Sequence, residues 1–142
     1  MKKRILGIDF GEVRTGLAVS DSLGMMAHGI GTVKTGGFKN LISIINEKIA
    51  EYGINLIVIG NPVNMNGTHG EKSEIVSSLA ELIKSELNIK VELLDERLTT
   101  SAAHEILNFT EIKSKKRKSV IDTLSAQIIL QNYLDSHPTI DI

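Results

Sequence analysis

Three acidic residues stand at the ends of predicted strands or helices, and together they suit one kind of chemistry. Asp9 closes an apolar run, Glu96 closes another, and Asp122 lies near the start of a long amphipathic stretch. Carboxylates that converge in a concave, poorly solvated site repel one another unless hard divalent cations neutralise them. Carboxylates that hold two metal ions can promote in-line attack on a phosphodiester. If the fold brings the three acids together, the pattern favours metal-assisted phosphodiester cleavage.

The segment around Asp9 also has a simpler explanation, because an Asp that ends a strand often caps a turn through its own backbone. Gly7 and Gly11 on either side carry no side chain, which would let a bulky anionic ligand approach the backbone. Arg14 could hold the turn or contact a phosphate. The neighbours therefore favour a binding site over a plain turn.

The other two acids raise the same choice. Side chains alternate along a strand, so only one of Asp95 and Glu96 can face the site while the strand lasts. Asp122 is expected in the first turns of its helix, where the helix dipole favours an anion by about 0.3–1 kcal/mol. Its neighbours Val120, Ile121 and Leu124 are apolar, so an inward carboxylate there needs a partner. A metal shared with Asp9 would supply one.

A basic run precedes Asp122: five of the six residues from 113 to 118 are Lys113, Lys115, Lys116, Arg117 and Lys118. The net charge of −1 gives the whole molecule no general attraction for nucleic acid. Such a run is often no more than a solvated face. Beside a carboxylate–metal centre, however, it would bind phosphates with a salt-dependent affinity that is indifferent to base sequence.

The periodicity of apolar residues predicts one α/β domain with the order β-β-β-α-β-α-β-α-α. The first half of the chain is expected to form strands at 4–10, 15–22 and 26–34, a helix from 38 that Gly53 caps, and a strand at 56–59. The second half is expected to form a helix at 71–87, a strand at 90–95, a short helix from 99 or 100 to 108, a polar basic loop at 109–116, and a helix at 118–134. The last helix should face the core with Ile121, Leu124, Ile128 and Leu130. This order predicts a mixed five-stranded sheet with helices on both faces and ligands beyond the carboxyl ends of its parallel strands.

The length and composition fit a single domain over residues 1–142, with a frayed tail at 137–142. The chain has no cysteine, which excludes disulfides, thiolate metal sites and a catalytic thiol. The first apolar run stops at Asp9, and no other run reaches the length of a membrane span. We therefore expect a cytoplasmic protein with no membrane partner.

Four blocks of the sequence, in order and over almost the whole chain, resemble the YqgF family of Holliday-junction-resolvase-like nucleases. They are Asp9-Phe10-Gly11-x-x-Arg14-x-Gly16-x-Ala18-x-Ser20-Asp21, Gly60-x-Pro62 with Asn66-Gly67-Thr68-x-Gly70, Asp95-Glu96-Arg97-Leu98-Thr99-Thr100-Ser101, and Ile121-Asp122-x-x-Ser125-Ala126-x-Ile128-Ile129-Leu130-Gln131. Ser125 and Gln127 depart from the residues that are commonly apolar in the last block.

The resemblance implies an RNase H-like fold and a bacterial, divalent-metal-dependent nuclease. It places the catalytic and metal-binding acids at Asp9, Glu96 and Asp122, with two Mg²⁺ or Mn²⁺ ions expected. Contacts to nucleic acid are expected from Arg14, Asn66, Arg97, Lys115, Lys116, Arg117 and Lys118. The family is associated with maturation of the 5′ end of pre-16S ribosomal RNA, so the expected partners are precursor RNA or ribosome precursors.

Three alternatives stay open from the sequence. The chain could resolve Holliday junctions in branched DNA, which would need a homodimer for symmetric cleavage where a monomer suffices for one cut. It could be a non-catalytic ribosome-assembly factor that binds nucleic acid. The segment Gly7-Ile8-Asp9-Phe10-Gly11 also resembles the phosphate loop of actin-like ATPases and sugar kinases, although those need two lobes around the nucleotide.

Overall fold

The computed structural model describes residues 4–62, 70–95 and 114–137, with only the backbone of residues 114–120. These residues form β1 (Arg4–Asp9), β2 (Arg14–Ser20), β3 (Ala27–Lys34), α1 (Gly37–Tyr52), β4 (Ile54–Asn61), α2 (Glu71–Leu87), β5 (Lys90–Asp95) and α4 (Ser114–Ser136). The short helix predicted at 99–108 and residues 138–142 of the tail predicted at 137–142 lie outside the described residues, while His137 N–H donates to the Leu134 carbonyl oxygen at the end of α4. None of the described helices is long and apolar enough to cross a membrane.

Within the described residues the strands form one five-stranded sheet in the order β3-β2-β1-β4-β5. β1 pairs with β2 and β2 with β3 in antiparallel fashion, whereas β1 pairs with β4 and β4 with β5 in parallel. The mixed sheet predicted from the sequence is therefore confirmed. The carboxyl ends of β1, β4 and β5 lie at one edge of the sheet, where Asp9 and Asp95 end their strands.

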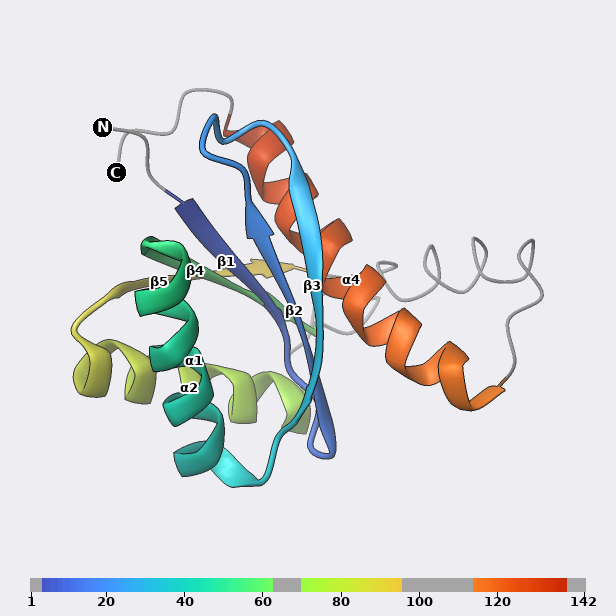
Figure 1. Cartoon of the computed structure of the whole chain (residues 1–142). Coiled ribbons are helices and arrows are strands. Elements are labelled where there is room, and N and C mark those ends of the chain that lie inside the picture. The colour runs from blue at the N-terminus through green and yellow to red at the C-terminus, as the bar shows by residue number, and fades with distance from the viewer. Residues whose placement is uncertain (1–3, 63–69, 96–113, 138–142) are drawn as a thin grey trace.

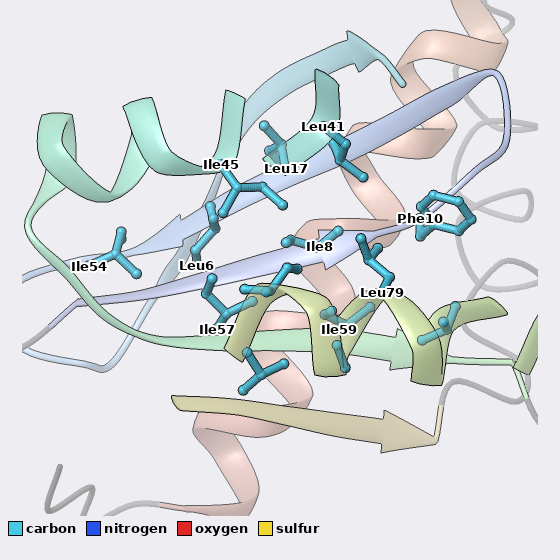
Figure 2. Close-up of a cluster of buried hydrophobic side chains, with 14 of the residues drawn as sticks. Leu6, Ile8, Phe10, Leu17, Leu41, Ile45, Ile54, Ile57, Ile59 and Leu79 are labelled. Atoms are coloured by element: carbon cyan, nitrogen blue, oxygen red, sulfur yellow. The ribbon is translucent and has the colours of Figure 1, made fainter. Parts of the chain in front are cut away.

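Helices cover both faces of this sheet, as predicted (Figure 1). On one face α1 and α2 pack against apolar side chains of β1, β2 and β4, which Figure 2 shows as a continuous cluster. On the other face α4 covers a second core that includes Ile5, Leu56 and Val58. Alternate residues of β4 enter the two cores, which explains why its sequence is a continuous apolar run.

The helix α4 differs from its prediction at both its start and its inner face. It begins at Ser114, so residues 114–116 are helical and the predicted loop there is wrong. Lys and Arg are good helix formers, and no Gly or Pro interrupts the basic run, so the helix extends through it. The residues packed in the second core are Ala126, Ile129, Leu130, Tyr133 and Leu134. Of the predicted inward residues, Leu124 and Ile128 only flank Ile121 in a small separate cluster.

The carboxyl half of α4 is held to both outer strands of the sheet, β5 and β3. The Tyr133 phenol donates a hydrogen bond to Glu92, and burial together with this carboxylate raises the pKa of Tyr133. Gln131 binds the hairpin between β2 and β3, with its Oε1 accepting from Ala27 N–H at 2.9 Å. These contacts fix the direction in which the rest of α4 crosses the strands.

Candidate functional site

The side chain of Asp9 faces α4. Ile8 enters the core under α1 and α2, and alternation along a strand turns its neighbours to the opposite face. Gly7 lies on that opposite face, since a Cβ added there would stand 2.8 Å from Leu130 Cβ of α4. Asp9 follows two residues later at the end of β1. Its carboxylate therefore belongs to the side of the sheet that α4 covers.

Gly16 has no side chain, and this lets Asp122 of α4 approach the strand next to Asp9. Gly16 is the direct partner of Asp9 across the antiparallel pair of β1 and β2. The backbone of α4 lies so close that a Cβ added to Gly16 would stand 1.9 Å from the carbonyl oxygen of Asp122. Opposite residues of an antiparallel pair lie about 5 Å apart and point to the same face. The backbone of Asp122 thus lies over the direct strand partner of Asp9, on the face of the sheet to which Asp9 points.

The partner of Asp122 is Arg14. Its Nε donates to Asp122 Oδ2 at 3.0 Å, with the Arg14 side chain 39% exposed and the Asp122 side chain 23% exposed. The sequence had suggested the helix dipole and a shared metal as partners for this carboxylate. Because α4 begins at Ser114, Asp122 lies in the third turn, beyond the first turn over which the dipole acts. The dipole interpretation is therefore wrong, and an ion pair stabilises Asp122 instead.

The turn that follows Asp9 is fixed by two buried threonines. Thr35 Oγ1 donates to the carbonyl oxygen of Gly11 at 2.6 Å and lies 2.7 Å from Thr15 Oγ1. A Cβ added to Gly11 would stand 2.2 Å from the Arg14 carbonyl oxygen, so only glycine fits there. Thr35 was not among the residues predicted for the site, although a polar residue just before a helix is a usual sign of a local hydrogen bond. This network sets the geometry between Asp9 and Arg14.

Further contacts fix the stretch of α4 around Asp122. Thr123 Oγ1 and Thr32 Oγ1 of β3 lie 2.7 Å apart, on the side of the helix next to Asp122. Ser125, one turn further along, is fully buried, and its Oγ has no hydrogen-bond partner. The helix therefore carries an unpaired buried hydroxyl within one turn of the acid.

The remaining predicted site residues separate into three groups. Asp95 lies on the opposite face to its neighbour Leu94, which packs in the α4 core, so Asp95 does not join Asp9 and Asp122. Lys115, Lys116, Arg117 and Lys118 lie at the start of α4, with their backbone alone described. Glu96, Arg97 and Asn66 lie outside the described residues.

The donor set can be compared with the needs of a metal ion. Asp9 and Asp122 offer carboxylate oxygens, the ligands that Mg²⁺ and Mn²⁺ prefer. The part of the chain that the structure describes contains no group of three or more acidic, His or Cys residues that could hold a metal. The chemistry of the pair fits a hard cation such as Mg²⁺, which one or two carboxylates can hold while water completes its coordination shell.

Comparison with known proteins identifies the class. The fold resembles that of Thermus thermophilus RuvC in complex with a Holliday junction substrate, with a TM-score of 0.56 over 96% of each chain at 16% identity. It also resembles the fowlpox virus Holliday junction resolvase, with a TM-score of 0.57 over 94% of this chain and 98% of that one at 15% identity. The chain thus has the RNase H-like fold of these resolvases.

The sequence matches give the family. The model of the RuvX family, described as Holliday junction resolvase, matches residues 3–136. Proteins from Clostridium novyi (46% identical over 94% of this chain and 98% of the relative) and Clostridioides difficile (48% over 93% and 94%) are named "Putative pre-16S rRNA nuclease". The chain belongs to the RuvX family of nucleases, which is the YqgF family that its motifs resemble.

Proposed function

We propose that this protein is a metal-dependent endonuclease that matures the 5′ end of pre-16S ribosomal RNA. The observation that carries the proposal is that Asp9 and the backbone of Asp122 lie on the same face of the sheet, because α4 packs directly on Gly16, the strand partner of Asp9. Glu96 is the proposed third acid. It follows Asp95, the last residue of β5, and the resemblance to the family assigns it to the metal site.

Asp9, Glu96 and Asp122 would hold the metal, which we propose to be two Mg²⁺ or Mn²⁺ ions. Bound there, the ions would supply an activated water and charge stabilisation at the leaving oxygen. The residues of the chain do the rest. The hydrogen bonds of Thr35 and the close approach at Gly16 hold two of the acids in place before substrate arrives, which lowers the entropic cost of the reaction.

Basic residues would bind the substrate backbone on this side of the molecule. Lys115, Lys116, Arg117 and Lys118 lie at the amino end of α4, where the helix dipole already favours anions and disfavours cations. A phosphate bound there would relieve the repulsion among these residues. Arg14, and Arg97 and Asn66 from segments beyond the described ranges, are proposed to contact further phosphates.

The choice of RNA follows the more similar proteins. The relatives at 46% and 48% identity are named for pre-16S rRNA, whereas the family description names Holliday junctions. Cleavage of branched DNA is the second candidate because of that description. We propose a cytoplasmic enzyme that meets its RNA in ribosome precursors, and a monomer would suffice for a single cut.

The test incubates purified protein with precursor 16S RNA and with four-way DNA junctions, each in Mg²⁺, Mn²⁺ or chelator. Asp9→Asn should reduce metal-dependent cleavage of RNA at least about 100-fold, because losing a metal ligand exceeds the usual effect of a ligand's supporting residue. Asp95→Asn is the matched control, since it makes the same change at a strand end on the opposite face. Full activity of Asp9→Asn would remove this residue from the mechanism.

A non-catalytic binding protein would give a different pattern. Alanine at Asp9, Glu96 and Asp122 would then leave RNA binding and cell growth unchanged, whereas alanine at Lys115, Lys116 and Arg117 would abolish both. For the nuclease, the acid variants lose cleavage and no longer support growth. Growth of a depleted strain that carries each variant distinguishes these outcomes.

A further inference from the structure

The ion pair between Arg14 and Asp122 joins two rigid backbones through one movable side chain. Arg14 begins β2, and its carbonyl lies against Gly11 in the fixed turn. Asp122 is held by the backbone contact at Gly16 and by the adjacent hydrogen bond of Thr123. The Arg14 side chain, in contrast, is 39% exposed. The pair can therefore open by rotation of Arg14 alone.

A divalent cation at Asp122 would compete with this guanidinium. Both are positively charged, and both interact with the same carboxylate, so each disfavours the other. A pair this exposed contributes little net stability because water screens it, so a metal ion displaces it at small cost. Among the side chains that the structure describes, which exclude those of residues 114–120, Arg14 is the cation that pairs with Asp122.

A second cation stands next to the position that Arg14 would take up. Lys34 is the direct partner of Arg14 across β2 and β3, so both side chains leave the sheet on the α4 face. Lys34 is exposed and has no ion pair among the residues described. Like charges directly opposite each other destabilise a strand pair. A phosphate held between Arg14 and Lys34 would remove that repulsion.

We propose that Arg14 is a displaceable counter-ion: it neutralises Asp122 in the metal-free protein, and with metal bound it turns to a substrate phosphate beside Lys34. This inference rests on the proposed metal-dependent function. It assigns Arg14 two successive partners, and it makes metal binding a condition for full affinity toward the nucleic-acid backbone.

The first experiment measures Mg²⁺ binding by calorimetry to the wild type, Arg14→Gln and the matched control Lys34→Gln. Arg14→Gln should bind Mg²⁺ about threefold tighter or more, because the competing charge is gone. Lys34→Gln removes an equal charge that is not bonded to Asp122. At physiological salt, the Mg²⁺ affinity of this variant should therefore change by less than about half of the change seen in Arg14→Gln. Unchanged or weaker binding by Arg14→Gln would overturn the proposal.

Stability and substrate binding give independent readouts. Arg14→Gln should change the melting temperature of the metal-free protein little, because water screens the pair. Mg²⁺ should raise the melting temperature of Arg14→Gln more than that of the wild type, because the variant binds the ion more tightly. Asp9→Ala, which removes a proposed metal ligand, should lose the Mg²⁺-dependent gain in RNA binding. In protein that keeps the three acids, Mg²⁺ should strengthen RNA binding more in the wild type than in Arg14→Gln.

Nuclear magnetic resonance follows the displacement in the unmodified protein. The Nε–H signal of Arg14, hydrogen-bonded without metal, should shift and exchange faster as Mg²⁺ saturates the site. A signal that Mg²⁺ leaves unchanged while calorimetry shows binding would refute the displacement. If the wild type binds no Mg²⁺ at all, the proposed function itself fails, and that result is distinct from failure of this inference alone.

Discussion

Gly16→Ala tests whether the close contact between β2 and α4 positions Asp122. A Cβ at this position would stand 1.9 Å from the Asp122 carbonyl oxygen and 2.4 Å from its carbonyl carbon. Ordinary contacts begin at 3.4 Å, so the helix backbone would have to retreat by about 1.5 Å. The obstacle is backbone, which cannot rotate out of the way. The substitution therefore moves Asp122 away from Asp9.

The expected magnitude follows from this displacement. Overpacking costs about 1–3 kcal/mol, and weakening the hydrogen bonds of Arg14 and Thr123 adds about 1 kcal/mol. A loss of about 2–4 kcal/mol leaves most domains of this size folded at 25 °C. Misplacement of a catalytic group by about 1 Å costs about 100-fold in rate, so cleavage should fall by at least that factor.

The assay combines urea unfolding with Mg²⁺-dependent cleavage of precursor RNA. Gly29→Ala is the matched control, because its Cβ would meet the side-chain atoms Thr123 Cγ2 at 2.6 Å and Gln127 Oε1 at 3.2 Å, whereas the helix backbone atom nearest to it, the Thr123 carbonyl oxygen, lies at an ordinary 3.7 Å. It should cost less stability and keep most of the activity. If Gly16→Ala unfolds like the wild type and cleaves within a few-fold of it, the contact does not position Asp122.

Three further changes test other parts of the structure. Ser125→Ala should raise the free energy of unfolding by up to about 1 kcal/mol in urea titration, because the buried Oγ has no partner; a comparable loss would contradict this. Thr35→Val should lower it by about 1–3 kcal/mol, because it removes the 2.6 Å donor to the Gly11 carbonyl and the hydroxyl partner of Thr15 Oγ1, and an unchanged value would show that these bonds are dispensable. The pKa of Asp21 is lowered, mainly because Met25 N–H donates to its carboxylate, so its stabilisation is present above the ordinary value of 3.8 and is lost as the pH falls below it. The difference in unfolding free energy between wild type and Asp21→Asn should therefore shrink in acid, and a difference that is constant with pH would refute the assignment.

Elements with strong periodic patterns were predictable from the sequence. The helix at 71–87 and the strand at 90–95 have the predicted bounds, and α1 ends where Gly53 adopts a left-handed φ of 68°. The start of α4 was predicted too late in the chain, because a polar basic run is typical of a loop, whereas its Lys and Arg residues are also good helix formers. Local patterns thus give elements, and their ends are less certain where two signals conflict.

The site was predictable only in part, for a different reason. The choice of Asp9 and Asp122 followed from their positions and from family resemblance, and the structure places both on one face. The ion pair of Asp122 with Arg14 joins residues far apart in the chain, and such pairing depends on the packing of α4 on β2. Gly16 did carry a signal, since a glycine inside a strand often marks close approach of another backbone.

The distance between the two acids along the chain bears on how the enzyme is made. A nascent chain that has been synthesised only as far as β5 contains every strand of the sheet and Asp9, but α4 and Asp122 have not yet been translated. The apolar residues that α4 later covers are then open to solvent, which favours chaperone binding or aggregation during synthesis. Under the proposed function, an active site that needs Asp122 forms only after α4 docks, so the growing polypeptide would not cut the RNA of the ribosome that is producing it.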